Sequence, residues 1–194
     1  MTENIEFSPG RTAVMCMDYQ NSIVSSYGGA GQELLLQRAG RVLDDARNRG
    51  MQVIYIRVGF RPGLPEISSR NALFSAVKNS PERKQMFVGD GMEVHAAVTP
   101  RENDIIITKH RVSGFTGTDL DMILRANEID TLVLFGIATS GVVLSTLVDA
   151  VDADYKVVVI KDCCADRDEE LHSCLTERYF TTRGAVITAD EFCE

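Results

Sequence analysis

Residues 131–148, TLVLFGIATSGVVLSTLV, form the stretch that decides the fold. Its first five residues show no alternation of apolar and polar side chains, which is typical of a strand buried on both faces. Gly136 ends this run, and Thr139 and Ser140 then offer hydroxyl groups that can cap a helix. From Val142 onwards, apolar residues recur at helical spacing. The stretch therefore predicts a central strand that turns directly into a helix, the place where open α/β sheets bind ligands.

Five other apolar segments predict the rest of the sheet. They are residues 12–17, 51–56, 104–108, 156–160 and 185–188. Helical periodicity predicts further helices near residues 31–49, 119–127 and 168–180. Short strands joined by helices form parallel sheets that are covered on both faces. We therefore predict an α/β fold, a three-layer α/β/α domain with a six-stranded, mainly parallel sheet of Rossmann-like topology, in a single domain of residues 1–194.

The segment from residue 57 to residue 100 differs from the rest because its periodicity is poor and it holds four of the five prolines. Long irregular stretches in a compact domain are usually lids or binding loops. The alternative is a solvated crossover between two strands. Arg57, at its start, is a candidate partner for a substrate carboxylate, since arginine binds carboxylates through two parallel hydrogen bonds.

Composition and charge exclude several classes of protein. The 194 residues carry a net charge of −8, which argues against a nucleic-acid partner. No apolar run is long enough to span a membrane, and the N-terminal MTENIEFSPG has neither the basic nor the apolar part of a leader peptide, so we expect a cytoplasmic protein. The five cysteines have no metal-like spacing and the three histidines are far apart, so we expect reduced thiols, no metal and no cofactor.

Two charged residues directly follow predicted strands. Asp18 comes after the strand at 12–17, and Lys109 comes after the strand at 104–108. A carboxylate in this position is either a turn former or a catalytic group, and the residues by themselves leave both interpretations open. Because the carboxyl ends of parallel strands meet at one edge of the sheet, we expect Asp18 and Lys109 to converge there, together with Val142.

These motifs together resemble the isochorismatase-like hydrolase superfamily, the cysteine hydrolases that include nicotinamidases. Asp18 and Gln20 are similar to the acidic motif of the family. Lys109, followed by residues 111–118 and Leu120, is similar to its lysine motif. The turn from Gly136 is similar to the nucleophile turn. The resemblance implies roles in substrate binding or an oxyanion hole for Gln20, Phe115 and four turn residues, namely Ile137, Ala138, Thr139 and Gly141. It also implies a cis peptide bond between Ile137 and Ala138, and a homo-oligomer, a dimer or larger.

The chain departs from this family at the nucleophile. The resemblance implies catalysis by an aspartate, a lysine and a cysteine, but Val142 stands at the cysteine position. Valine has no lone pair, so the covalent thioacyl route is closed there. Cys16, Cys163 or Cys164 as a relocated nucleophile remains an alternative. The metal motif of some relatives is also missing after the second predicted strand.

Three hypotheses for the function follow. Asp18 protonates a vinyl ether, as in true isochorismatases, although the turn lacks the histidine that those enzymes carry. Alternatively, Asp18 acts as a base in water-mediated hydrolysis of another small molecule, with the turn as an oxyanion hole. The third hypothesis is a non-catalytic protein that keeps the pocket and has a small-molecule-binding or regulatory role. We favour the hydrolase, with Asp18 and Lys109 as the catalytic residues.

Overall fold

The structure is a computed structural model that describes residues 5–27 and 29–194. The expectation that the N-terminal residues form no leader peptide falls partly on residues 1–4, which lie outside the described residues. The strands are β1 (Thr12–Met17), β2 (Gln52–Val58), β3 (Ile105–Lys109), β4 (Thr131–Gly136), β5 (Lys156–Ile160) and β6 (Ala185–Ile187). The helices are α1 (Asn21–Tyr27), α2 (Gln32–Asn48), α3 (Ala72–Lys78), α4 (Pro81–Gln85), α5 (Leu120–Ala126), α6 (Leu144–Asp152), α7 (Glu169–Cys174) and α8 (Ala189–Cys193).

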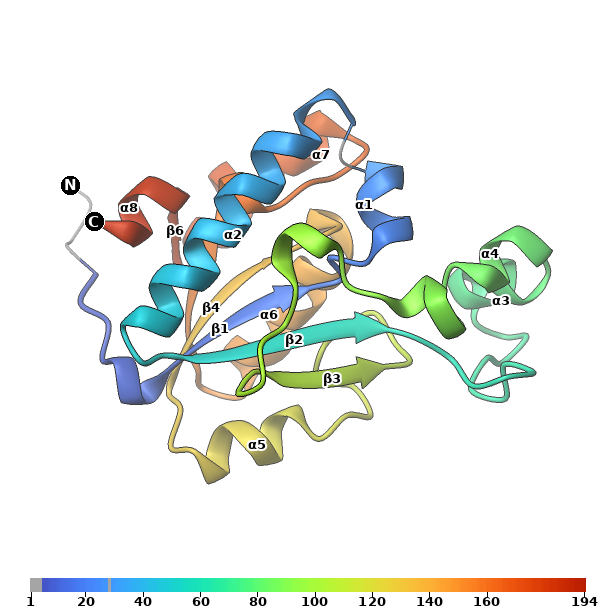
Figure 1. The fold of residues 1–194 in the computed structure, drawn as a ribbon, viewed down its shortest axis with the longest axis horizontal. Helices are drawn as coiled ribbons and strands as arrows, with labels where there is room; N and C mark the ends of the chain where they lie inside the picture. The colour runs from blue at the N-terminus through green and yellow to red at the C-terminus, as the bar shows by residue number, and fades with distance from the viewer. Residues whose placement is uncertain (1–4, 28) are drawn as a thin grey trace.

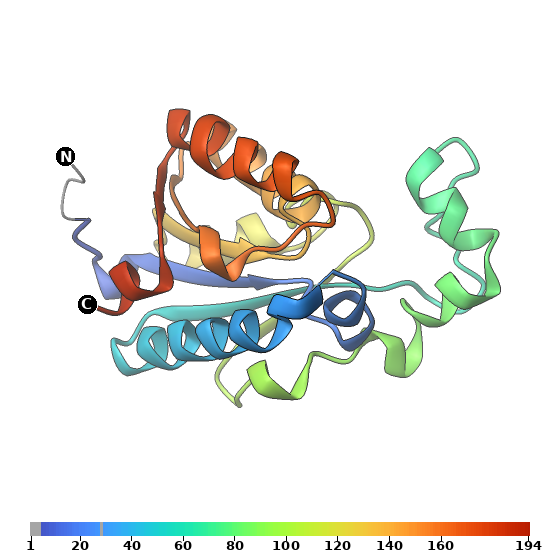
Figure 2. The same ribbon diagram turned by 90° about the horizontal axis from the view of Figure 1, so that it is seen from above.

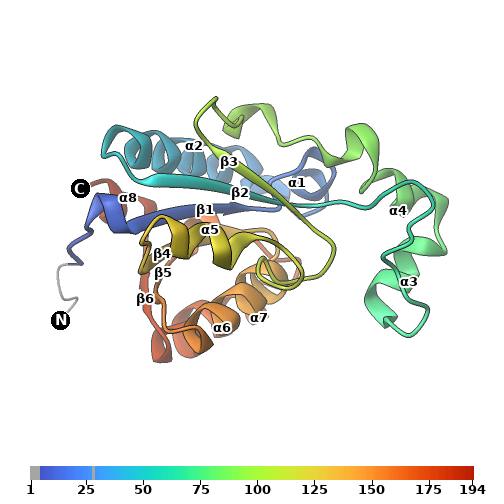
Figure 3. The same ribbon diagram turned by 90° about the horizontal axis from the view of Figure 1, so that it is seen from below.

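The predicted six-stranded sheet is confirmed, and all of its strand pairs are parallel. Its order is β3-β2-β1-β4-β5-β6, so the chain builds outward from β1 to β3 and then returns to the centre at β4. The long helix α2 lies on one face, and α6 and α7 lie on the other, which gives the predicted three layers (Figures 2 and 3). The strand order reverses between β1 and β4, and this is the position where ligands bind in such sheets.

The core explains why the strand sequences lack alternation. Every residue of β1 is buried, and so are five of the six residues of β4, because helices cover both faces of these central strands. The deciding stretch forms β4, a π-helical turn at Thr139–Val143 and then α6, close to the prediction. No helix of the described residues is both long and apolar enough to cross a bilayer.

The segment between β2 and β3 is less irregular than predicted. It contains α3 and α4, which lie beyond the carboxyl end of β2 at one end of the molecule (Figure 1). The Asn71 side chain caps α3, and Ser80 caps α4 with Pro81 in its first turn. These helices of seven and five residues are too short to show periodicity. The predicted helix at 168–180 is likewise interrupted, since α7 ends at Cys174 and a π-helical turn follows.

Candidate active site

Asp18 leaves the end of β1 at the centre of the sheet. Its N–H donates to the carbonyl of Ile56 at 2.8 Å, which continues the pairing of β1 with β2 by one residue. At Asp18 the backbone then takes a φ of 58°, a conformation that aspartate tolerates better than most residues. The side chain is only 8% exposed. The carboxyl group is therefore held inside the carboxyl edge of the sheet.

Lys109 is the last residue of β3 and reaches the same place from the edge of the sheet. Its Nζ lies 2.9 Å from Asp18 Oδ2, and the lysine side chain is 3% exposed. Nζ also donates to the carbonyl of Arg111 at 3.1 Å. Strand β2 separates β1 from β3, so the lysine side chain spans the end of β2, beside Val58, its partner in register. The expected convergence of Asp18 and Lys109 is thus present as a buried ion pair.

Burial controls the electrostatics of this pair. Burial raises the pKa of Asp18 above its ordinary value and outweighs the opposing effect of Lys109. Oδ2 faces Lys109, whereas Oδ1 is buried without a hydrogen-bond partner among the described residues. An unpaired buried oxygen is costly in a protein interior. Oδ1 can therefore hold a proton or accept a hydrogen bond from a bound molecule.

The turn after β4 lies beside Asp18 because β4 pairs with β1 up to Gly136 and Met17. Glycine is needed there, since a Cβ on Gly136 would lie 2.8 Å from the carbonyl oxygen of Met17. The same Cβ would lie 3.3 Å from Val142 Cγ1, so Val142 packs against this junction. Val142 is 2% exposed and forms part of the wall. The expected cis peptide between Ile137 and Ala138 is confirmed.

The loop after β5 and the helix α7 that follows it hold this turn with three hydrogen bonds. Thr139 N–H donates to Ala165 O at 2.9 Å, and Ser140 N–H donates to Asp166 Oδ2 at 2.7 Å. The Thr139 hydroxyl lies 2.8 Å from Nδ1 of His172, whose pKa burial lowers, so its imidazole is neutral at neutral pH. The Ala138 N–H makes no hydrogen bond within the described part of the chain. It is a candidate donor for an oxyanion.

Three predicted binding residues are engaged elsewhere. The Gln20 amide is buried and both accepts from and donates to the backbone of Val58, at 2.7 and 2.9 Å, so it holds the end of β2. Arg57 donates to Thr108 Oγ1 at 3.0 Å, one register position before Val58 and Lys109 and thus on the opposite face of the sheet. The centre of the Phe115 ring lies 6.0 Å from that of Tyr155, which precedes β5 at the amino end of the sheet.

The cysteines lie in surroundings that do not favour a nucleophile. Cys16, Cys163 and Cys164 are all buried. Burial raises the pKa of each thiol, that of Cys164 to about 12, so the reactive thiolate is scarce at neutral pH. Within residues 5–27 and 29–194, no group of three or more His, Cys, Asp or Glu side chains could hold a metal ion.

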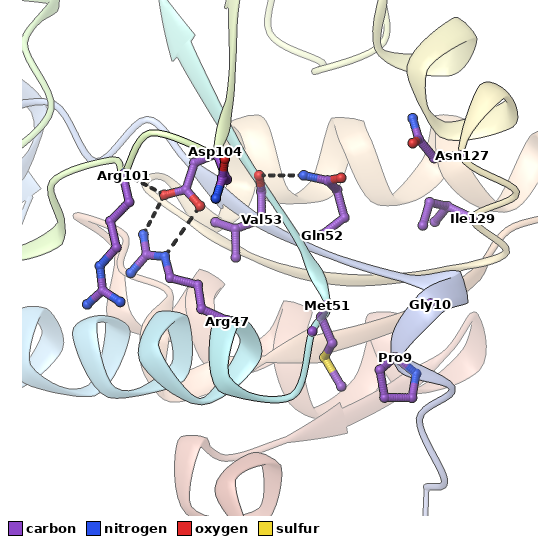
Figure 4. A pocket seen from close by; sticks show the side chains of 12 residues that line it. Pro9, Gly10, Arg47, Met51, Gln52, Val53, Arg101, Asp104, Asn127 and Ile129 are labelled. Atoms are coloured by element: carbon purple, nitrogen blue, oxygen red, sulfur yellow. Dashed lines mark hydrogen bonds and ion pairs between the residues drawn. The ribbon is translucent and has the colours of Figure 1, made fainter.

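One cavity lies at the amino end of the sheet and another near its carboxyl end. The cavity of about 480 Å³ in Figure 4 is at the amino edge, lined by Pro9, Gly10, Met51 and Gln52, which precede or begin strands. It is therefore remote from Asp18. Another, of about 630 Å³, is lined by the loop that holds the turn, including Cys164, Asp166 and His172. The role of Asp166 could not be predicted, because a hydrogen bond from the Ser140 N–H to an aspartate in another loop leaves no pattern in the sequence.

Comparisons with known proteins agree with this geometry. A family model described as the isochorismatase domain matches residues 12–191. The ureidoacrylate amidohydrolase RutB of Rhizobium rhizogenes is 33% identical over 215 residues, covering 98% of this chain and 85% of that protein. The RutB of Agrobacterium fabrum is also 33% identical, with 98% and 92% covered.

Solved structures show the same similarity. A cysteine hydrolase from Pseudomonas syringae pv. phaseolicola has a TM-score of 0.85 and 26% identity, covering 100% of this chain and 97% of that one. N-carbamoylsarcosine amidase from Thermoplasma acidophilum has a TM-score of 0.72 and 30% identity, covering 93% and 97%. The family match, the relatives and the buried Asp18–Lys109 pair lead to one conclusion: the chain belongs to the isochorismatase family of hydrolases.

Proposed function

We propose that this protein hydrolyses a small molecule without a cysteine nucleophile, with Asp18 as the acid or base. The observation that carries the proposal is the buried Asp18 carboxyl group, with Lys109 on one oxygen and no partner on the other. Its pKa is raised toward neutral pH, and a catalytic acid or base works best when its pKa is near the pH at which the enzyme operates. Lys109 orients the carboxyl group and stabilises negative charge that develops on the substrate.

Val142 decides how the bond is broken. A valine side chain cannot attack a carbonyl carbon, so water is the nucleophile. In the first form of the reaction, Asp18 protonates the vinyl carbon of an enol ether and water captures the resulting cation. In the second, Asp18 takes a proton from water, which adds to a carbonyl carbon while Lys109 and the Ala138 N–H stabilise the oxyanion. The adduct then collapses, the C–N bond breaks, and Asp18 returns the proton to the leaving nitrogen. Both forms need one carboxyl group that can exchange a proton.

The relatives favour the second form. Ureidoacrylate amidohydrolase and N-carbamoylsarcosine amidase are named as enzymes that hydrolyse amide-type C–N bonds. The turn of this chain, with the available Ala138 N–H, supports the same stabilisation of an oxyanion. The change from cysteine to Val142 then replaces a thioacyl intermediate by direct addition of water.

Release of ammonia and of pyruvate from a panel of ureides, amides and vinyl ethers tests the proposal. We expect Asp18→Asn to lower turnover by about 10²- to 10⁴-fold, the usual contribution of general acid–base catalysis. Val142→Ala serves as the control and should stay within about tenfold of wild type, since no bond of the transition state is lost. Undiminished activity in Asp18→Asn would refute the proposed role. Wild-type binding without any turnover would instead favour the non-catalytic alternative.

A further inference from the structure

The helical segment that follows β4 begins without a cap of its own. Its N-cap residue is Ala138, whose side chain makes no cap hydrogen bond, and the caps predicted from the sequence, Thr139 and Ser140, lie inside the segment instead. The first N–H groups of a helix have no partner within the helix, and a side-chain oxygen usually accepts from one of them. Here that oxygen comes from another loop, because the Ser140 N–H donates to Asp166 Oδ2 at 2.7 Å.

The loop that supplies Asp166 is itself paired with the turn. Ala165 accepts from the Thr139 N–H at 2.9 Å and donates to the Gly136 carbonyl at 3.4 Å. These two bonds lie on either side of Ala138 along the chain, so the backbone of the turn is held at both ends. The pairing of β4 therefore continues past the end of the strand, and the residue after Ala165 arrives at the start of the helical segment.

The Asp166 carboxylate is held as a hydrogen-bond acceptor. Oδ1 accepts from the Arg167 N–H at 2.8 Å, and Oδ2 is directed at the Ser140 N–H. Partial burial acts to raise the pKa of Asp166, but hydrogen bonds from Ser140 and from the backbone N–H groups of Asp168 and Arg167 outweigh it and lower the pKa. The group is therefore ionised at neutral pH and can only accept, with its negative charge at the positive end of a helix.

The same loop also contacts α1. Arg167 Nε donates to the Ser26 carbonyl at 3.4 Å, and its guanidinium lies 4.4 Å from the centre of the Tyr27 ring. Helix α1 begins at Asn21, three residues after Asp18. The loop is thus anchored both on the turn and on the segment that follows the candidate catalytic carboxyl group, so it fixes the position of one relative to the other.

We propose that Asp166 is a positioning residue, which caps the helical segment from outside and so fixes the Ala138 N–H beside Asp18. The inference rests on the proposed function, in which this N–H stabilises an oxyanion. Asp166 itself touches neither the substrate nor the reacting atoms. An N–H that acts on the transition state alone changes kcat and not the binding of the substrate, so loss of Asp166 should lower kcat and leave KM unchanged.

Two measurements on the same variants test the inference. The amide resonances of Ala138 and Ser140, and their exchange with deuterium, report on the turn without any substrate. Steady-state kinetics on the panel of ureides, amides and vinyl ethers give kcat and KM. Asp166→Ala removes the acceptor, and Asp166→Asn keeps one oxygen that can accept from Ser140. Asp168→Ala is the matched control, because Asp168 lies in the same loop and its Oδ1 caps α7 at the Leu171 N–H.

In Asp166→Ala we expect the Ser140 amide to exchange about 10- to 100-fold faster, the range of a hydrogen bond to a charged group, and the Ala138 resonance to shift. At constant KM, kcat should fall by about 10- to 100-fold, because a small displacement of a catalytic group costs that much. Asp166→Asn should keep kcat within about threefold of wild type and the Ala138 resonance in place, because asparagine caps helices as well as aspartate does. Asp168→Ala should change neither kcat nor this resonance.

Thermal melting shows whether each variant is folded, and Asp166→Ser, with a shorter side chain, takes the place of Asp166→Ala if the latter is not. An unshifted Ala138 resonance in Asp166→Ala would overturn the inference. An equal loss of kcat in Asp168→Ala, or a raised KM with unchanged kcat in Asp166→Ala, would overturn it as well. If the wild type turns over no substrate, the proposed function fails, and the Ala138 resonance then decides the inference by itself.

Discussion

Replacement of Asp18 by asparagine should remove activity and leave the fold at least as stable as the wild type. Two opposing contributions to the free energy of unfolding decide the outcome. Removing one partner of a buried ion pair typically costs about 3–5 kcal/mol, because the other charge is left unpaired. However, burial already raises the pKa of Asp18 in spite of Lys109, which means that ionised Asp18 is less favourable in the fold than in the unfolded chain. Asparagine keeps the shape and can still accept from Lys109.

The sign of the effect follows from proton binding. The ordinary pKa of an aspartate is 3.8, and the pKa of Asp18 in the folded protein is higher. At pH values between these two, the folded state binds more protons than the unfolded state. The stability that Asp18 contributes is therefore complete below pH 3.8 and is lost as the pH rises through the folded pKa. Each unit of the shift is equivalent to about 1.4 kcal/mol. For a chain of this length that is roughly 3–6 °C in melting temperature per unit.

Urea unfolding of wild type and Asp18→Asn at a series of pH values from 4 to 8 measures this difference. We expect the advantage of Asp18→Asn to be smallest at pH 4, to grow with pH and then to level off. A loss of about 3 kcal/mol or more at pH 8 in Asp18→Asn would refute the reasoning, because it would show that the attraction to Lys109 exceeds the cost of burial.

Two further predictions concern the same site, and a third concerns assembly. Lys109→Met should lose more stability at pH 8 than at pH 5 in urea unfolding, because the buried Asp18 charge then has no cation beside it. Val142→Cys should form a covalent acyl adduct with p-nitrophenyl acetate, detected by mass spectrometry, since the first turn of a helical segment favours a thiolate; an unmodified protein would contradict this. We also expect a homo-oligomer, so light scattering at micromolar concentration should give a mass well above 21.4 kDa.

Sequence patterns predicted the parts of the site that follow from strand ends. Asp18 and Lys109 directly follow or end apolar strands, and parallel strands bring such residues to one edge whatever the loops do. The orientation of Arg57 depends on which face of β2 it occupies, and a one-residue shift in register reverses that face. Phe115 could not be placed because the path of its loop is set by bonds to α6, such as that of Gly114 N–H to Thr146.

The cost of the Asp18–Lys109 pair is itself an argument for its function. Apolar residues of similar volume at the ends of β1 and β3 would stabilise this junction as well or better, since buried ion pairs often contribute less than a well-packed apolar pair. The carboxyl oxygen that faces no donor adds to the cost. The neighbouring valine shows that this edge of the sheet accepts an apolar side chain, because Val142 is buried against Gly136 without a polar contact. Packing therefore does not require the charged pair, whereas a reaction that moves a proton does, and this is why we propose that Asp18 carries the chemistry.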